Sequence, residues 1–129
     1  MRHLIATICF LAFSLTAAAQ KKETPETQYE MKKYYLVLLK RGPEQGQDSA
    51  TLAALMKEHL AHLERMYNEN KMSMCGPLAV DNEIRGICVY HIDDIEEVRR
   101  LAGSDPAVKA GRLTVQVLPW YTAKGMILK

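Results

Sequence analysis

Apolar and polar positions alternate along the chain in blocks that predict six regular elements. Four short runs rich in branched and aromatic residues, bounded by charges, glycine or proline, are typical of β-strands; they are residues 33–40, 71–77, 84–91 and 113–118. Two segments have the spacing of amphipathic helices. The first begins at Asp48 or Ser49 and ends near residues 68–70, and the second is capped by Asp93. The predicted order is therefore strand, helix, strand, strand, helix, strand.

The first predicted helix carries a histidine inside its apolar stripe. Each helical residue advances about 100° around the axis, which gathers the apolar side chains on one side. They are Leu52, Leu55, Met56, Leu60, Leu63, Met66 and Tyr67. His59 lies near the middle of this stripe and His62 at its edge, so we expect His59 to face the sheet. Asn70 suits the left-handed turn that often follows a helix.

This order predicts an α+β fold, a ferredoxin-like βαββαβ antiparallel sheet with two helices on one face. No element remains to cover the other face, so we expect a homodimer formed through that open sheet face. The short connection between residues 71–77 and 84–91 makes these strands antiparallel neighbours, and the simplest register sets Cys75 opposite Cys88. A disulfide between them needs specific geometry, and two buried free thiols are the simpler alternative.

The first 19 residues have the layout of a secretory signal peptide. An apolar run of twelve residues, 4–15, follows a basic start, and Ala17-Ala18-Ala19 precedes a predicted cleavage before Gln20. A membrane-spanning helix needs roughly 20 apolar residues. We therefore expect a secreted or periplasmic protein with no stable membrane insertion after cleavage. Residues 20–32 read as a disordered linker, 33–121 as the domain and 122–129 as a C-terminal tail.

The charge of the mature chain is nearly balanced. Removing Arg2 from the 17 basic residues leaves 16 against 15 acidic residues. This balance gives no argument for a nucleic-acid or anionic-membrane partner. The sequence also lacks a phosphate-binding Gly-rich loop, a dinucleotide fingerprint and a G-x-S-x-G motif, so we predict no cofactor.

His59 is the strongest candidate for acid–base chemistry. An imidazole serves as a general acid or base when a carboxylate fixes its tautomer. Asp105 is the best candidate for that carboxylate, because in an Asp-Pro step one oxygen can cap the following turn while the other reaches the first helix. A core histidine bonded to backbone, with Asp105 acting only as a cap, is the simpler alternative.

Other polar residues are weaker candidates. No H-E-x-x-H or paired-cysteine motif is present, so we predict no metal site, although His59, His62 and either His91 or Asp105 are a conceivable ligand set. The Gly-Pro step ends a strand and its backbone also suits a pocket floor. We predict contacts with an unknown small-molecule ligand for four residues: Ser73, Gly76, Pro77 and Ser104.

Several motifs resemble the YCII-related (YciI-like) domain family of the dimeric α/β-barrel superfamily. Between residues 33 and 121 they are, in order, His59-Leu60, Gly76-Pro77, the run SDPAVKAG from Ser104 to Gly111, and Val117-Leu118-Pro119-Trp120. The resemblance implies a ferredoxin-like fold, a dimer and a His–Asp site, which by motif is His59 and Asp105. It also implies similarity to dehydrochlorinases that eliminate HCl from chlorinated hydroxyquinols, with muconolactone isomerases and small monooxygenases in neighbouring families. Asn70, where relatives often have Gly, and the signal peptide are departures from the family.

The leading hypothesis is an exported small dimeric enzyme. In it His59, oriented by Asp105, moves protons during elimination or isomerisation of a small cyclic or phenolic molecule. One alternative is a non-catalytic dimeric module that binds a small ligand through the same two residues. Another is a structural His–Asp pair that ties the first helix to the rest of the fold.

Overall fold

The computed structural model describes residues 28–129; residues 1–27, which hold the predicted signal peptide and most of the predicted linker, lie outside the described residues. The predicted order of elements is confirmed, and the turn that Asp105 was expected to cap is a further short helix. The elements are β1 (Met31–Arg41), α1 (Ser49–Asn68), β2 (Met72–Pro77), β3 (Ile84–Tyr90), α2 (Ile95–Gly103), α3 (Pro106–Lys109) and β4 (Leu113–Ala123).

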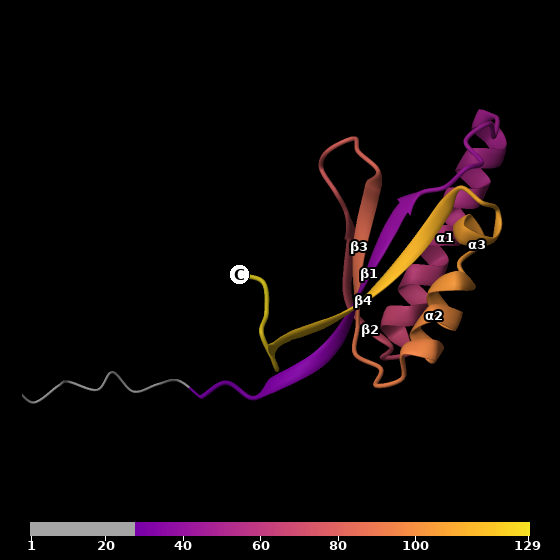
Figure 1. Cartoon of the computed structure of the whole chain (residues 1–129). Helices are drawn as coiled ribbons and strands as arrows, with labels where there is room; N and C mark the ends of the chain where they lie inside the picture. Colours follow the sequence, from indigo (N-terminus) through magenta and orange to yellow (C-terminus); the bar gives the residue numbers. More distant parts are fainter. Residues whose placement is uncertain (1–27) are drawn as a thin grey trace, which may run out of the picture.

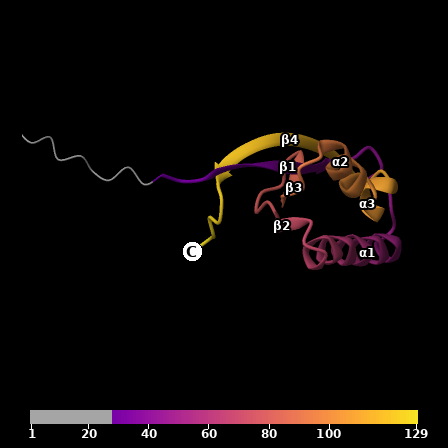
Figure 2. The ribbon, with the colours of Figure 1, turned by 90° about the horizontal axis from the view of Figure 1, so that it is seen from below.

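The four strands form one antiparallel sheet in the order β2-β3-β1-β4. The helices lie together on one side of this sheet, as Figures 1 and 2 show. The α+β ferredoxin-like fold expected from the sequence is therefore confirmed. Within residues 28–129 no helix has the length and apolar character needed to cross a membrane.

The core lies between the sheet and the helices. Alternate residues of β1, namely Tyr35, Val37 and Leu39, are buried on the helix side, as the two-residue period of a strand requires. Val98 and Leu101 of α2 pack against the same cluster. α1 and α3 also contact each other, and Ala107 of α3 and Met66 of α1 belong to the same cluster.

The β2–β3 hairpin has the register that the sequence predicted. Cys75 pairs with Cys88 across the two strands, and both side chains are free thiols in the structure. A register shift between Met72 and Met74 leaves Ser73 as the extra residue of a β-bulge. Bulges of this kind redirect a side chain at the edge of a sheet.

Two strands are longer than predicted. β1 begins at Met31, inside the segment assigned to the linker, and β4 continues past Leu118 to Ala123. The reason is that these ends pair with each other, Met31 with Ala123, beyond the last pairing of β1 with β3. The resulting two-stranded arm extends away from the helices in Figure 1. Pro119 fits inside β4 because β4 is an edge strand.

The helix ends agree with the sequence except at α2. Asp48 caps α1 by accepting a hydrogen bond from the Thr51 N–H, and Asn70 takes the left-handed conformation with φ 56°. The prediction that Asp93 caps α2 is wrong: the cap is Asp94, whose Oδ1 accepts from the Glu96 N–H at 2.9 Å. The carbonyl of Asp93 instead accepts a hydrogen bond from the Tyr35 hydroxyl.

The apolar stripe of α1 is rotated relative to the prediction. The residues that α1 buries are His59, His62 and Met66, whereas Leu60 is 61% exposed. His62, predicted at the edge of the stripe, is thus among the most buried side chains of the helix. The stripe is wide enough to serve two purposes: one part packs on the fold, and the other, which includes Leu60, lines an open pocket.

Candidate functional site

His59 and Asp105 form a buried pair. His59 Nδ1 lies 2.6 Å from Asp105 Oδ2, and the two residues are 5% and 1% exposed. His59 comes from the middle of α1 and Asp105 from the turn that starts α3. The contact predicted from the Asp-Pro motif and the helical stripe is therefore present.

The two oxygens of Asp105 have different partners. Oδ1 accepts a hydrogen bond from the Ala107 N–H at 2.8 Å and so caps α3, with Pro106 in its first turn. Oδ2 accepts from His59, and because a carboxylate can only accept, the proton on the imidazole belongs on Nδ1. This arrangement leaves the lone pair of the ring on Nε2. Asp105 is thus both a helix cap and the residue that sets the tautomer of His59.

The second ring nitrogen of His59 is left without a protein partner. Among the described residues only His62 Nε2 is a fully buried polar side-chain atom without a hydrogen-bond partner. His59 Nε2 also has no partner within residues 28–129 but is not fully buried, and His59 lines the pocket described below. A nitrogen that carries a free lone pair beside a pocket can accept a proton from a bound molecule.

The pocket beside His59 has a volume of about 460 Å³ and lies between α1 and the sheet. Volumes of roughly 300–1,000 Å³ are usual for small-molecule sites. Its walls are mostly apolar and include Leu39, Met56, Leu60, Leu63, Pro77 and Leu113. Its polar side chains come from His59, two cysteines and two arginines.

Cys75 and Cys88 form part of the wall opposite α1. Burial raises the pKa of Cys75, and burial followed by the neighbouring Cys75 raises the pKa of Cys88 to about 12. Both groups therefore remain thiols at neutral pH rather than the reactive thiolates. They border the pocket as small, weakly polar groups.

Of the four predicted ligand contacts, the structure brings two to the pocket. Gly76 and Pro77 line it, in agreement with a pocket floor made by the end of β2. Ser73 hydrogen-bonds His91 Nδ1 at 2.8 Å, and Ser104 donates to the Leu101 carbonyl at 2.7 Å at the end of α2. Neither serine is among the residues that line this pocket.

His62 is buried next to the pair but in a different environment. Its Nδ1 accepts a hydrogen bond from the guanidinium of Arg65 at 2.9 Å. Burial lowers the pKa of His62, the cations of Arg65 and Lys109 and the imidazole of His59 add to that effect, and Asp105 opposes it. His62 is therefore neutral at neutral pH. Within residues 28–129 no group of three His, Cys, Asp or Glu side chains is arranged to hold a metal ion.

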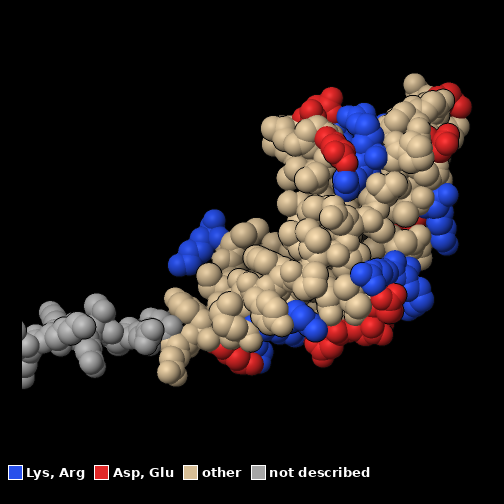
Figure 3. All heavy atoms as spheres, viewed as in Figure 1, with Lys and Arg blue, Asp and Glu red and all other residues tan. Residues whose placement is uncertain are grey.

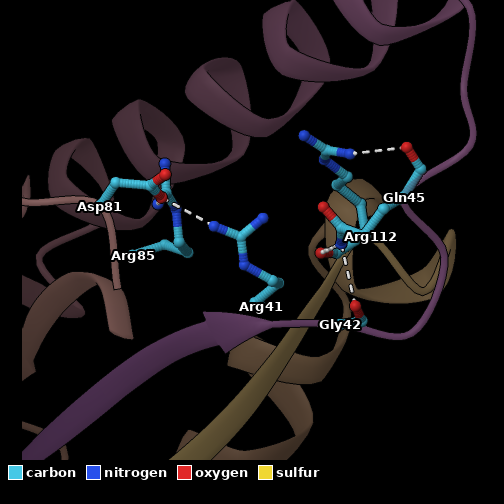
Figure 4. Close-up of polar contacts among 6 residues, drawn as sticks. All are labelled: Arg41, Gly42, Gln45, Asp81, Arg85 and Arg112. Atoms are coloured by element: carbon cyan, nitrogen blue, oxygen red, sulfur yellow. Dashed lines mark hydrogen bonds and ion pairs between the residues drawn. The ribbon is translucent and has the colours of Figure 1, made fainter. Parts of the chain in front are cut away.

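Sequence patterns did not identify the arginines at the pocket. Arg85 of β3 and Arg112, just before β4, line it, and Arg41 at the end of β1 lies between them in Figure 4. In the sequence Arg41 and Arg112 lie at or next to the end of a strand and Arg85 is the second residue of one, and charges at such places are ordinarily solvated. Only the strand order, which sets the ends of β1, β3 and β4 close together, brings them to one site.

Comparison with known proteins agrees with this fold. The model of the YCII-related domain family matches residues 33–121. The chain belongs to the YCII-related domain family. The match spans more than half of the 129 residues, and its bounds are those of the domain that the sequence predicted. His59 and Asp105 both lie within it.

Among the solved structures similar to this YCII-domain chain is 5-chloro-2-hydroxyhydroquinone dehydrochlorinase from Burkholderia phenoliruptrix, in complex with 2,5-dihydroxybenzoquinone. The two chains are 21% identical, and the match covers 67% of this chain and 92% of the dehydrochlorinase, with a TM-score of 0.47. No curated protein matches the sequence. The assignment of family and fold rests on the family match and on the strand topology.

Proposed function

We propose that this YCII-domain protein is an exported, dimeric enzyme that moves protons in the elimination or isomerisation of a small cyclic or phenolic molecule. His59 is the catalytic acid–base residue, and Asp105 is the residue that positions it. The observation that carries the proposal is the 2.6 Å contact between His59 Nδ1 and Asp105 Oδ2. It leaves Nε2 free beside a pocket of about 460 Å³.

The geometry supports proton transfer over nucleophilic catalysis. A general base needs a lone pair on the side of the substrate and a partner that fixes the ring, and His59 has both. A cysteine nucleophile needs a thiolate, and the raised pKa values of Cys75 and Cys88 disfavour one at neutral pH. The apolar walls of the pocket suit the carbon skeleton of a ring.

In the proposed reaction His59 Nε2 removes a proton from a carbon or hydroxyl of the bound molecule. The imidazolium that forms is stabilised by the Asp105 carboxylate, which already accepts the Nδ1 proton. In an isomerisation the same nitrogen returns the proton to another atom. In an elimination the electrons of the broken bond expel a leaving group, and the proton is passed to solvent.

The test is a substrate screen with a matched pair of histidine variants. The panel holds chlorinated hydroxyquinols, other phenols and unsaturated lactones, followed in D₂O by NMR so that deuterium incorporation reports proton transfer even without net turnover. We expect His59→Gln to lower the rate about 10²–10⁴-fold. His91→Gln is the control, because His91 bonds Ser73 and the Asn70 carbonyl away from the pocket. Full turnover by His59→Gln refutes the catalytic role of His59. If the parent protein binds a compound of the panel without deuterium exchange or turnover, the non-catalytic ligand-binding module is favoured.

The dimer is part of the proposal because one face of the sheet is uncovered and apolar. The strand registers set Leu36 and Leu38 of β1 beside Leu118 of β4 and Ile87 of β3 on the side away from the helices. Leu118 and Trp120 are 37% and 42% exposed. Exposed apolar side chains grouped on one face of a sheet are typical of an interface, and a second copy supplies a matching face by symmetry.

Sedimentation of strand variants tests the dimer. Trp120→Glu puts a charge on the open face, and we expect it to convert dimers into monomers. Tyr121→Glu is the matched control, since Tyr121 is 64% exposed and points to the opposite side of the same strand. A monomeric parent protein, or equal effects of the two variants, contradicts this interface.

The proposal that the protein is exported depends on the signal peptide predicted at residues 1–19. Expression of the full chain should yield a mature protein whose N-terminus is Gln20, detected by intact mass. Deleting the apolar run at residues 4–15 should leave the protein unprocessed inside the cell. Retention of residues 1–19 in the exported protein contradicts cleavage.

A further inference from the structure

Two arginines line the pocket beside His59, and a third lies near them. Arg85 and Arg112 belong to the pocket wall, and Arg41, which shares Asp81 with Arg85, is drawn between them in Figure 4. They come from the ends of β1 and β3 and from the residue before β4. Figure 3 shows basic side chains gathered in the hollow between the β2–β3 hairpin and the start of α1, with carboxylates to either side.

The positive charge of this group is only partly balanced. Arg41 Nη2 lies 2.7 Å from Asp81 Oδ1, and Arg85 pairs with the same carboxylate oxygen. Arg112 donates only to neutral oxygens, the Gln45 carbonyl at 3.3 Å and Gln47 Oε1 at 3.4 Å. Within residues 28–129 Arg112 makes no ion pair. Arg41 and Arg85 thus share the single carboxylate of Asp81, and Arg112 has no countercharge within residues 28–129.

The backbone around Arg112 is held in place before any ligand binds. The Gly42 N–H donates to the Arg112 carbonyl at 2.9 Å, and the Gln45 side-chain amide donates to the same oxygen at 3.0 Å. Gly42 is required for this close approach, since a Cβ at that position would lie 2.1 Å from the Gly111 carbonyl oxygen. Figure 4 shows the link between Gly42 and Arg112. The Arg112 guanidinium itself donates to the Gln45 carbonyl and to Gln47 Oε1, so the side chain already has a direction and loses little freedom when it pairs with an anion.

The remaining walls limit what the anion can be. Leu60, Leu63 and Leu113 offer apolar surface, which binds a hydrophobic body better than a hydrated inorganic anion. The guanidinium fork matches two coplanar oxygens, the geometry of a carboxylate. The pocket volume of about 460 Å³ admits a single ring with substituents but not a nucleotide with its phosphates.

We infer that the substrate of this site is a small cyclic carboxylate, whose carboxylate pairs with Arg112 and Arg85 while its ring packs on the leucines within reach of His59. The inference rests on the proposed function for the reaction, and it adds the substrate class. Arg112 is the specificity-determining residue. Asp81 competes for Arg85 and leaves Arg112 as the stronger attraction for an incoming anion.

Binding of benzoate and benzamide to the mature protein tests the inference. The two probes share size and shape and differ in charge. NMR titration should show benzoate shifting the amide signals of Gly76 and Gly86, which line the pocket, with benzamide at least about tenfold weaker, the factor expected for one charge-assisted hydrogen bond. Arg112→Gln should weaken benzoate by a similar factor and leave benzamide unchanged.

The controls separate this inference from the proposed function. Arg100→Gln changes an exposed arginine of α2 away from the pocket and should not alter binding. Arg112→Lys keeps the charge but loses the fork, and should bind benzoate with intermediate affinity. His59→Gln should still bind benzoate. Cyclic carboxylates are added to the substrate screen; if His59→Gln binds benzoate while the parent protein turns over no compound of the screen, the inference stands and the proposed function fails.

Three results overturn the inference. The first is equal affinity for benzoate and benzamide, and the second is unchanged benzoate affinity in a folded Arg112→Gln protein. The third is no benzoate binding at its solubility limit. If turnover of a neutral ring compound depends on His59 but not on Arg112, the proposed function survives and the carboxylate assignment is wrong.

Discussion

Replacing Asp105 with asparagine should reverse the tautomer of His59. Asparagine keeps the shape of the side chain but has one acceptor oxygen and one donor group in place of two acceptors. If the oxygen continues to cap α3 through the Ala107 N–H, the amide NH₂ faces His59 Nδ1. The imidazole can keep this hydrogen bond only by accepting it. Its proton then moves to Nε2, the nitrogen that the proposed reaction needs unprotonated.

The stability change should be small for asparagine and large for alanine. Asparagine keeps both hydrogen bonds but makes the one to His59 neutral, which costs about 1 kcal/mol. Alanine removes the cap of α3, which costs about 0.5–2 kcal/mol. It also leaves the Nδ1–H of His59, a residue that is 5% exposed, without a partner, which costs about 1–3 kcal/mol. The two losses together amount to about 1.5–5 kcal/mol.

Two measurements check this prediction. Long-range ¹⁵N–¹H NMR spectra distinguish the protonated from the unprotonated ring nitrogen of His59 in the parent and in Asp105→Asn. Urea unfolding gives the stability changes, with the m-value as a test of two-state behaviour. Asp48 is the matched control, because it caps α1 through the Thr51 N–H at 3.0 Å and has no histidine partner. Asp48→Ala should cost about 1 kcal/mol, the effect of a cap alone.

Two outcomes refute the reasoning. If His59 has the same tautomer in the parent and in Asp105→Asn, Asp105 does not orient the ring. If Asp105→Ala costs no more than Asp48→Ala, the buried contact adds nothing to the cap. In either case the acid–base role of His59 loses its physical basis, even with the 2.6 Å contact in place.

Three further predictions concern the surroundings of the site. Burial lowers the pKa of His62, so its contribution to stability is complete above about pH 6.5, the unfolded value, and is lost as the pH falls. His62→Leu should therefore reduce the difference in unfolding free energy between pH 7.5 and pH 5, measured by urea unfolding. An unchanged difference contradicts the prediction. Peptide mapping after iodoacetamide should find Cys75 modified slowly in the native protein and Cys88 only after denaturation, since Cys88 is buried with its pKa raised to about 12. Gly42→Ala should lower thermal stability by about 1–3 kcal/mol through a backbone clash, whereas Gly46→Ala, with open space around the new Cβ, should be neutral or stabilising.

The sequence was sufficient for those features that depend on local pattern. Strand and helix periodicity gave the order of the elements, and the short β2–β3 connection set the Cys75–Cys88 register, which the structure confirms. The pairing of His59 with Asp105 followed from two local signals, a polar residue in an apolar stripe and an aspartate before a proline. Each signal also had a purely structural explanation, and only the topology of the fold indicated that the two residues lie close together.

Features that depend on pairing across the chain were not predictable in this way. The lengths of β1 and β4 are set by their contact with each other, Met31 with Ala123, about ninety residues apart. The arginines come from three strand ends, where a single charge carries no signal. The orientation of α1 depends on which part of its wide apolar stripe packs on the core and which part lines the pocket. Both parts are apolar, so the hydrophobic pattern alone does not tell them apart.

The two histidines of α1 show why the site must be assigned from contacts rather than from position on the helix. His59 and His62 are one turn apart and both buried, at 5% and 1% exposure. A guanidinium donates to His62 Nδ1, so a neutral His62 carries its proton on Nε2, a buried nitrogen without a partner among the described residues. A carboxylate accepts from His59 Nδ1, which puts the lone pair on the nitrogen that faces the pocket. The partners therefore impose opposite tautomers on two similar residues, and only His59 is left with a basic nitrogen that a small molecule can reach.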